Sequence, residues 1–187
     1  MAIKGGVTST GPGMDAVIKA VDRLTRRSAY VGIPAVADPR NDGSPFGNAA
    51  IGYTNEMGAP ERNLPPRPHL LPGVKEAHDE IVELLRKAGQ AALKGDSAKV
   101  DLALAHAGEI AIRHVKNMVA AGLKPPLAPA TVREHLRARG LSVAEIAKRK
   151  NPAPGVVDPS AGENPLILTG AYLQALTYLV ADHDALA

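Results

Sequence analysis

The chain has 187 residues, of which 45% are hydrophobic and 22% charged, ordinary values for a globular protein that argue against wholesale disorder. It contains no cysteine, which excludes disulfides, thiolate metal sites and a cysteine nucleophile. The net charge is only +3 and aromatic residues make up 3% of the chain, so it lacks both the charge of a histone-like tail and a supply of rings that stack on single-stranded nucleic acid.

The N-terminal part is predicted as an arm, a helix, a strand and a long loop. Residues 1–13 are small and Gly-rich, which is typical of a flexible arm. Apolar residues recur at helical spacing from Met14 to Leu24 and predict a three-turn helix. The β-branched, alternating segment 28–33 predicts a short strand, and the Pro- and Gly-rich segment 34–47 a long surface loop.

The middle of the chain is predicted to be mainly helical. Residues 48–57 fit a strand or a helix, and we predict a short helix because Asn48 suits an N-cap and Gly58 a C-terminal cap. Five prolines over 59–73 predict a stiff, extended strap. Two long helices follow, over 74–93 and about 97–121, and their short connection predicts an antiparallel hairpin.

The apolar stripes of these two helices and of the first strand predict the core. Eight helical residues and two strand residues are expected to be mutually buried: Ile81, Leu84, Leu85, Leu104, Ala107, Ile110, Ala111, Val115, Val31 and Ile33.

The segment 123–165 is predicted as an extended and helical excursion that ends in a linker. The patterns Thr131-x-x-Glu134 and Ser142-x-x-Glu145 are capping boxes, each expected to open a short basic helix. A short helix from about Thr169 and a strand near 177–180 close the chain. We therefore expect a single α+β domain over 1–187, with the helix hairpin packed on a small, mostly antiparallel sheet.

Nothing in the sequence nominates an active site. His106, Glu109 and His114 share a helix flank, but a solvated surface is the plainer interpretation, and the acidic cluster over 76–83 is typical of a solvent face. No nucleophile motif or phosphate-binding loop is present. We expect no catalytic residue, cofactor or metal. A hydrolase is a third possible class of function, but no sequence feature supports it.

The membrane and secretory classes are also disfavoured. No apolar run approaches the ~20 residues of a membrane span, and the first ten residues lack the apolar core of a signal peptide. We expect synthesis in the cytoplasm and no membrane partner.

The basic segment 131–150 resembles the first part of a helix-turn-helix motif. A major-groove reader needs a further helix, and the Pro-rich sequence that follows does not supply one. A small DNA-binding regulator is therefore the alternative function, and non-specific contact with duplex DNA stays open. The candidate DNA-facing residues are Arg133, Arg137, Arg139, Lys148, Arg149 and Lys150.

Four separated pieces of the chain together resemble one family. They are YVGI at 30–33; NAAIGYTNEMG at 48–58; NLPPRPHL at 63–70; and PLAPAT at 126–131 with PLILTGAYL at 165–173 and TY at 177–178. In this order and approximate spacing, over nearly the whole chain, they resemble the tailed-phage neck and tail-completion proteins, which lie between the head connector and the tail tube. Three positions depart from the family pattern: His69 replaces a usual Phe, Leu168 an Asp and Ala175 a common Ser.

The resemblance implies a structural virion protein of the neck or tail region, assembled in the host cytoplasm. It implies a homo-oligomeric ring, usually of six copies, that contacts head-connector or adaptor proteins and tail-tube or terminator proteins and lets DNA pass. The residues it marks as structural or interface positions are Glu56, Gly58, Arg67, Pro68, Leu70, Thr169, Gly170 and Tyr178.

Glu56 and Arg67 are expected to form an ion pair. Glu56 lies at the C-terminal end of its predicted helix, where the dipole disfavours a carboxylate, so it needs a compensating partner. Arg67 sits between prolines that restrict its backbone, and arginine suits bidentate pairing with a carboxylate. The pair is predicted within a subunit or across the ring interface.

Overall fold

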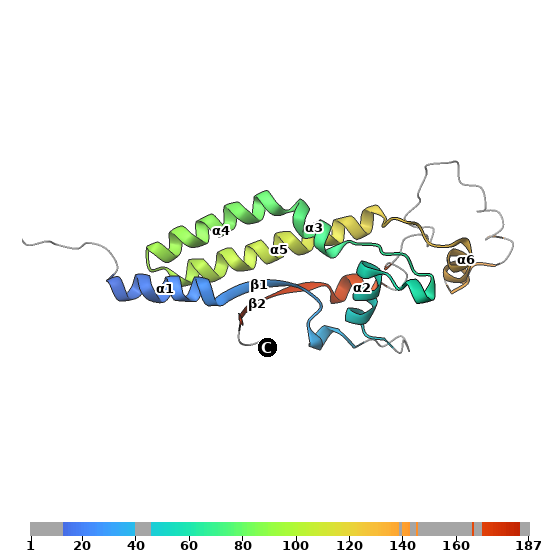
Figure 1. Cartoon of the computed structure of the whole chain (residues 1–187), viewed down its shortest axis with the longest axis horizontal. Helices are drawn as coiled ribbons and strands as arrows, with labels where there is room; N and C mark the ends of the chain where they lie inside the picture. The colour runs from blue at the N-terminus through green and yellow to red at the C-terminus, as the bar shows by residue number, and fades with distance from the viewer. Residues whose placement is uncertain are drawn as a thin grey trace, which may run out of the picture. The chain divides into compact units, whose positions relative to one another are not determined.

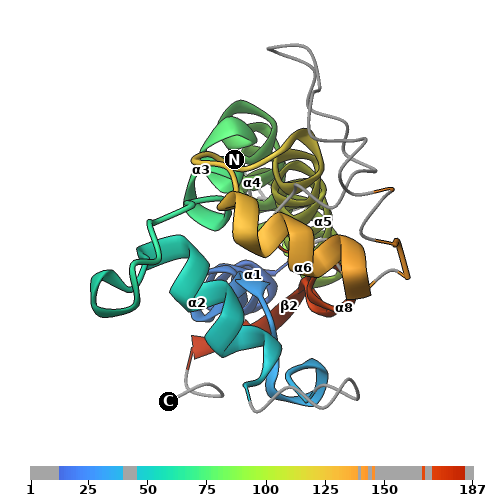
Figure 2. The same cartoon turned by 90° about the vertical axis from the view of Figure 1, so that its right-hand side faces the viewer.

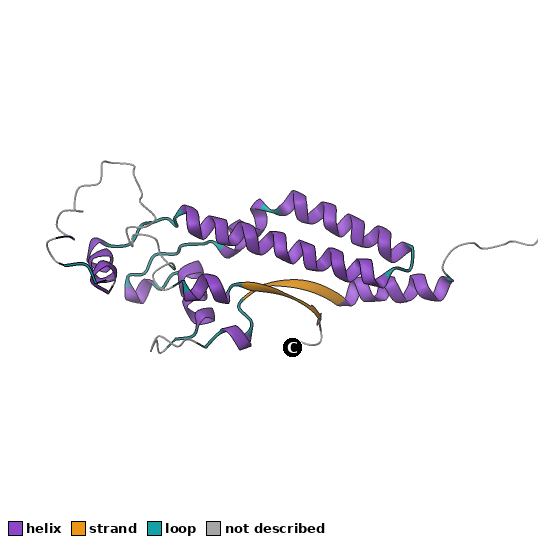
Figure 3. Ribbon diagram, turned by 180° about the vertical axis from the view of Figure 1, so that it is seen from behind, coloured by secondary structure: helices purple, strands orange, loops and turns teal. Residues whose placement is uncertain are grey.

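The computed structural model describes residues 13–39, 46–138, 140–142, 145, 166 and 170–183. Within them the chain is mostly helical with one small sheet of two antiparallel strands (Figures 1 and 3), so the α+β class is confirmed. The expected arm over 1–13 lies outside the described residues except for Gly13, and so does the linker over 151–165.

The described elements follow one another in a simple order. They are α1 (Met14–Arg26), β1 (Arg27–Gly32), the 3-10 helix η1 (Ala35–Ala37), α2 (Asn48–Met57), the 3-10 helix η2 (Pro60–Arg62), α3 (Leu70–Glu76), α4 (His78–Leu93), α5 (Ser97–Ala121), α6 (Pro129–Ala138), α8 (Ala171–Ala175) and β2 (Thr177–Asp182). They divide between two compact units: Met1–Tyr30, Asp79–Ile110 and Leu179–Ala187 form the first, and Val31–His78 and Ala111–Tyr178 the second.

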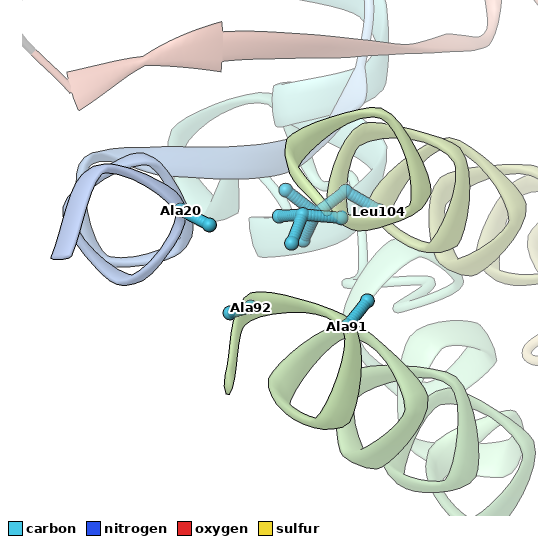
Figure 4. Packing of buried hydrophobic residues seen from close by; sticks show 5 residues of the cluster. Ala20, Ala91, Ala92 and Leu104 are labelled. Atoms are coloured by element: carbon cyan, nitrogen blue, oxygen red, sulfur yellow. The ribbon is translucent and has the colours of Figure 1, made fainter. Parts of the chain in front are cut away.

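The first unit has a small core in which alanine predominates. Ala20 of α1, Ala91 and Ala92 of α4, and Val100 and Leu104 of α5 are buried together. Figure 4 shows Ala20 pointing toward Leu104, with Ala91 and Ala92 contributed by the neighbouring helix. Small side chains let helix backbones approach closely, so a modest number of residues closes this core.

An ion-pair cluster reinforces the same unit. Arg23 of α1 donates from Nε to Asp101 of α5 at 3.0 Å, and Arg27 Nε lies 3.2 Å from the same carboxylate. Arg27 also donates from Nη2 to the backbone oxygen of Val180 in β2, at 3.3 Å. Asp101 thus connects α1, β1 and α5.

The second unit packs around a separate core. Its fully enclosed members are Ile112 and Val115 of α5 and Tyr172 and Leu176 at the end of the chain. Half-buried residues complete it: Val31, Ile33, Ile51, Leu70, Val74, Leu166, Leu173 and Tyr178. In Figure 2 the short helices α2, α6 and α8 of this unit face the viewer.

Several predicted elements are confirmed. The first helix, the strand that follows it, the short helix α2, the long helix α5 and the closing strand all form within one or two residues of the predicted bounds. Asp96 begins α5 by accepting a hydrogen bond from the Lys99 N–H at 3.1 Å, as a capping carboxylate should. Gly58 ends α2 with φ of 76°, a left-handed value that favours glycine.

The predicted helix over 74–93 is wrong in its first part. The structure has two helices, α3 and α4, separated at Ala77, whose φ and ψ are −80° and 1°. Helix α3 starts four residues before the predicted bound, inside the strap that was expected to be extended. It begins there because Glu56 accepts from its first N–H groups, and Pro72 fits in a first turn that needs no N–H of its own.

The core prediction is correct for four of the five α5 residues, and it is wrong for α4, where none of the three predicted residues is buried. Leu104, Ala107, Ala111 and Val115 are buried. Leu85 is 43% exposed, because α4 turns its alanines inward instead. The remaining predicted members are only half-buried: Ile81, Leu84, Ile110, Val31 and Ile33.

One of the two predicted capping boxes is wrong. Helix α6 begins at Pro129, so Thr131 lies inside it and does not cap it. Proline favours the first helical position because its φ is already fixed there. The other box is confirmed: Ser142 Oγ donates to the Glu145 carboxylate at 2.6 Å, and the Glu145 N–H donates back to Ser142 Oγ at 3.3 Å.

Candidate functional site

A network of polar contacts in the second unit begins with Glu56 in the last turn of α2. Its Oε2 accepts hydrogen bonds from the backbone N–H groups of His69 at 2.7 Å and Leu70 at 2.9 Å. Its Oε1 accepts from the N–H of Leu71 at 3.1 Å. One carboxylate therefore satisfies three donors at the start of α3, where the helix dipole favours negative charge.

The charge of Glu56 is stabilised by these contacts. Burial by itself would raise the pKa of the Glu56 carboxyl, but the three backbone N–H groups and the nearby His69 ring outweigh burial. The pKa therefore lies below the ordinary value of 4.5, and the group is ionised at neutral pH.

His69 links this carboxylate to the end of the chain. The imidazole is fully buried, with Nδ1 3.0 Å from the backbone oxygen of Arg67 and Nε2 2.6 Å from the hydroxyl of Tyr172. A carbonyl only accepts, so Nδ1 carries the proton and donates; in the neutral imidazole Nε2 is then the acceptor of the tyrosine hydroxyl. Nδ1 also lies 3.1 Å from Glu56 Oε2, and the two rings meet edge to face with centroids 5.5 Å apart.

Tyr172 is the third member of this chain of hydrogen bonds. It is 4% exposed, and its ring fits against Gly52 of α2, where an added Cβ would lie 2.8 Å from the ring and hydroxyl. Burial, followed by the negative charge of Glu56, raises the pKa of the Tyr172 hydroxyl well above its ordinary value. The hydroxyl therefore stays protonated and serves as the donor to His69.

Arg67 makes a second connection from the same strap. Arg67 is 3% exposed, and its guanidinium donates from Nε to the backbone oxygen of Pro125 at 2.7 Å and from Nη2 to that of Pro126 at 3.1 Å. Its backbone N–H donates to the backbone oxygen of Asn55 in α2 at 2.5 Å. Burial lowers its pKa, although an arginine stays charged. Nη1 has no hydrogen-bond partner within the described part of the chain.

The predicted ion pair between Glu56 and Arg67 does not form within the described chain. Glu56 is compensated by the N-terminus of α3, and Arg67 points to two proline carbonyls. The reasoning that Glu56 needs a partner is correct, but the partner is backbone. Pairing across a ring interface stays a prediction.

Together these groups hold four segments of the chain: the end of α2, residues 63–69 of the strap, the segment Pro125–Pro126 and α8. Every polar atom of Glu56, His69 and Tyr172 named above is used inside the site, and His69 is closed to solvent. This arrangement fixes the four backbone segments through side-chain hydrogen bonds.

An apolar pocket of about 200 Å³ borders the site. Its walls come from the end of β1, from α2, from the start of α3 and from the end of the chain. The lining residues are Gly32, Ile33, Ala49, Gly52, Tyr53, Glu56, His69, Leu70, Tyr172 and Leu176.

The other predicted interface residues do not all converge here. Leu70 does belong to the site, since its N–H donates to Glu56, whereas Tyr178 packs on the second core. Pro68 is exposed, and Gly170 precedes α8 with φ of 70°. Thr169 lies outside the described residues.

The predicted DNA-facing residues are described only in part. Arg133 and Arg137 are exposed one turn apart on α6. The remaining four lie outside the described residues: Arg139, Lys148, Arg149 and Lys150.

The sequence reasoning missed the roles of His69, Tyr172 and the two proline carbonyls. The one available signal was His69 itself, a polar ring where the family pattern has Phe, since a buried imidazole needs hydrogen-bond partners. Its partner Tyr172 lies 103 residues away, and no spacing rule links positions so far apart.

Two searches of the described residues found no further site. They contain no group of three or more His, Cys, Asp or Glu residues placed to hold a metal ion. Among them there is also no helix with the length and apolar character needed to cross a membrane.

Comparison with known proteins returned no match for this chain among protein-family models, curated proteins or solved structures.

Proposed function

We propose that this chain is a structural virion protein of a tailed phage, a neck or tail-completion protein that forms a ring, joins the tail to the head connector and lets DNA pass. It would act without catalysis or a cofactor, and its partners are further copies of itself and the proteins on either side of the ring.

The observation that supports this proposal is the convergence of the motif pieces that carry the resemblance. Glu56 of the piece 48–58 accepts from the backbone N–H of His69 in the piece 63–70, and Tyr172 of the closing piece bonds the His69 ring. Pro126, also of the closing piece, accepts from Arg67. Residues of three of the four motif pieces thus meet at one site, as expected if the pieces belong to one motif.

The proposal includes the finer fold, an antiparallel hairpin of long helices on the small sheet. Helices α4 and α5 are joined by residues 94–96 alone, and the end of one packs with the start of the other through Ala91, Ala92 and Val100. A rigid body of this kind, with a pre-ordered proline strap, suits stepwise assembly because little conformational entropy is lost on docking.

Electron microscopy of the purified full chain tests the proposal. Negative-stain images of the protein alone, and mixed with isolated phage tail tubes, are expected to show rings and rings bound at tube ends. Protein that forms no ring at any concentration and never associates with tube ends would contradict the proposal.

A small DNA-binding regulator is the competing function, supported by the exposed Arg133 and Arg137 on α6. Duplex binding measured over a salt series separates the two. A regulator shows affinity that depends on sequence, and replacing both arginines by glutamine weakens it. A neck ring shows weak, sequence-blind binding or none.

A further inference from the structure

The pocket of about 200 Å³ that borders Glu56 gathers aromatic rings from a chain that has few of them. The whole sequence contains only four tyrosines and one phenylalanine, yet Tyr53 and Tyr172 both line this pocket. Helices α2 and α8, which carry the two tyrosines, pack against each other (Figure 2), and every lining residue belongs to the second unit. The face of an aromatic ring is negative, so a wall that contains two tyrosines favours a cation.

The charge on the pocket wall points the same way. The only Asp, Glu, Lys or Arg residue among the lining residues is Glu56, whose carboxyl group is ionised at neutral pH. Its side chain is 18% exposed, and three backbone N–H groups hold the carboxylate in place. Arg67 of the neighbouring strap does not line the pocket, because its guanidinium bonds the carbonyls of Pro125 and Pro126. A fixed negative charge attracts a cation and repels a phosphate or a carboxylate.

The hydrogen-bonding groups of the wall are already used within the protein. The His69 ring bonds the backbone oxygen of Arg67 and the Tyr172 hydroxyl, and apart from the residues discussed so far the wall consists of glycine and aliphatic residues. A primary ammonium ion would lose bound water here without full replacement of its hydrogen bonds. A quaternary ammonium ion donates no hydrogen bond and presents methyl groups, so apolar walls, aromatic rings and one carboxylate suit it.

The size and position of the pocket allow such a ligand to enter. A cavity of about 150 Å³ with apolar walls accommodates benzene, so a pocket of about 200 Å³ has room for a trimethylammonium group with a short chain. Its wall includes Tyr53, which is 68% exposed, and Tyr172, which is 4% exposed. The pocket therefore extends inward from the surface.

We propose that this pocket binds a small quaternary ammonium compound, with the cationic group beside Glu56 and the rings of Tyr53 and Tyr172. The inference is independent of the proposed function, because it concerns a free small molecule and neither requires nor excludes assembly into a ring.

The first test compares two ligands of one shape that differ in charge. Isothermal titration calorimetry of the purified full chain, at constant ionic strength, is expected to show saturable binding of choline. The matched probe is 3,3-dimethylbutanol, in which carbon replaces the charged nitrogen of choline. Its dissociation constant is expected to be about fivefold higher or more, because it keeps the apolar contacts but is not attracted by the carboxylate and the rings.

The second test changes the ring of Tyr53, which is exposed enough to be replaced without disturbing the core. The variant Tyr53→Leu keeps an apolar side chain and removes the ring, and it is expected to weaken choline binding about fivefold. The matched control Tyr53→Phe keeps the ring and is expected to bind choline within about twofold of the wild type.

The third test establishes the place of binding with two neighbouring alanines of α2. Both are exposed, but only Ala49 lines the pocket. Ala49→Leu adds bulk to the pocket wall and is expected to weaken choline binding by about threefold or more. Ala50→Leu adds the same bulk outside the pocket and is expected to leave binding unchanged.

Each alternative outcome is decisive. Equal binding of choline and 3,3-dimethylbutanol would show an apolar pocket that does not select for charge, and would overturn the proposal. So would the absence of saturable choline binding, equal affinities of the leucine and phenylalanine variants at residue 53, or equal effects of the two alanine replacements.

Discussion

In the second unit, single side chains hold backbone segments in place through hydrogen bonds, and Glu56 is an example. A carboxylate at the C-terminal end of a helix is unfavourable by itself. Here the same group lies at the N-terminal end of the next helix and accepts three backbone hydrogen bonds. The Glu56 carboxylate is therefore unfavourable for the helix that carries it but stabilises the start of the next helix.

Replacing Glu56 with Gln is expected to destabilise the protein by about 1–3 kcal/mol at neutral pH, because an amide NH₂ cannot accept from the N–H groups that the carboxylate now satisfies. Chemical denaturation measures the difference. The pKa of Glu56 is lowered in the folded state, so its contribution is present above the ordinary pKa of 4.5 and is lost as the pH falls through the folded value. The stability gap between wild type and variant should therefore narrow in acid; a constant gap would contradict this account.

Replacing His69 with Phe, the residue of the family pattern, is expected to cost about 1–3 kcal/mol because the Tyr172 hydroxyl is left buried without its acceptor. The double variant His69→Phe, Tyr172→Phe removes both polar groups and should recover part of that loss. A thermodynamic cycle of the four proteins measures the coupling, and additive effects would show that the hydrogen bond contributes nothing.

At the scale of elements, close backbone approach decides where helices pack. Gly73 of α3 lies against α5, and a Cβ added there would stand 2.7 Å from the Cα of Val115. The contact depends on the absence of a side chain, and it brings the strap and α3 directly onto the second core.

The variant Gly73→Ala is expected to destabilise the protein, since the clash is with backbone and one of the two helices must shift; overpacking of this kind costs about 1–3 kcal/mol. Gly89 in α4 is the matched control, because an added Cβ there meets nothing within 4 Å. Gly89→Ala should stabilise by up to about 1 kcal/mol through helix propensity. Thermal unfolding of both variants checks the prediction, and equal shifts of the same sign would refute the packing argument.

At the scale of the whole molecule, contacts between distant segments hold each unit together. Arg67 bonds Pro125 and Pro126 across almost sixty residues of sequence, and in the first unit Arg23 bonds Asp101 across nearly eighty. Such links close long loops, so their effect reaches segments that no local pattern connects.

Replacing Arg67 with Lys is expected to release the segment 123–128, because an ammonium is a single point of charge and does not reproduce the two-carbonyl contact of a guanidinium. Hydrogen exchange should become faster in this segment, and the stability should fall by about 1–3 kcal/mol. The control is Arg86→Lys, whose exposed pair with Glu83 has little influence on stability. Unchanged exchange over 123–128 in the Arg67 variant would show that the contact does not hold the segment.

The sequence by itself was sufficient for the elements whose signal is local. The apolar period of α5, the glycine that ends α2 and the alternation of β1 are each local signals, carried by residues close together in the sequence, and each element forms as predicted. The buried stripe of α5 from Leu104 to Val115 follows for the same reason, since a long helix has only one apolar face to bury.

Only the tertiary structure decided the start of α3, the exposure of Leu85 and the composition of the site. Helix α3 begins early because a carboxylate from another helix caps it, and Leu85 is excluded because alanines allow a closer approach. His69 finds its acceptor and donor among groups brought together by folding. Asn48 of α2 is likewise buried only in the folded chain, where its amide donates to the backbone oxygens of Ala37 and Asp38, because a buried polar side chain needs partners that folding brings close.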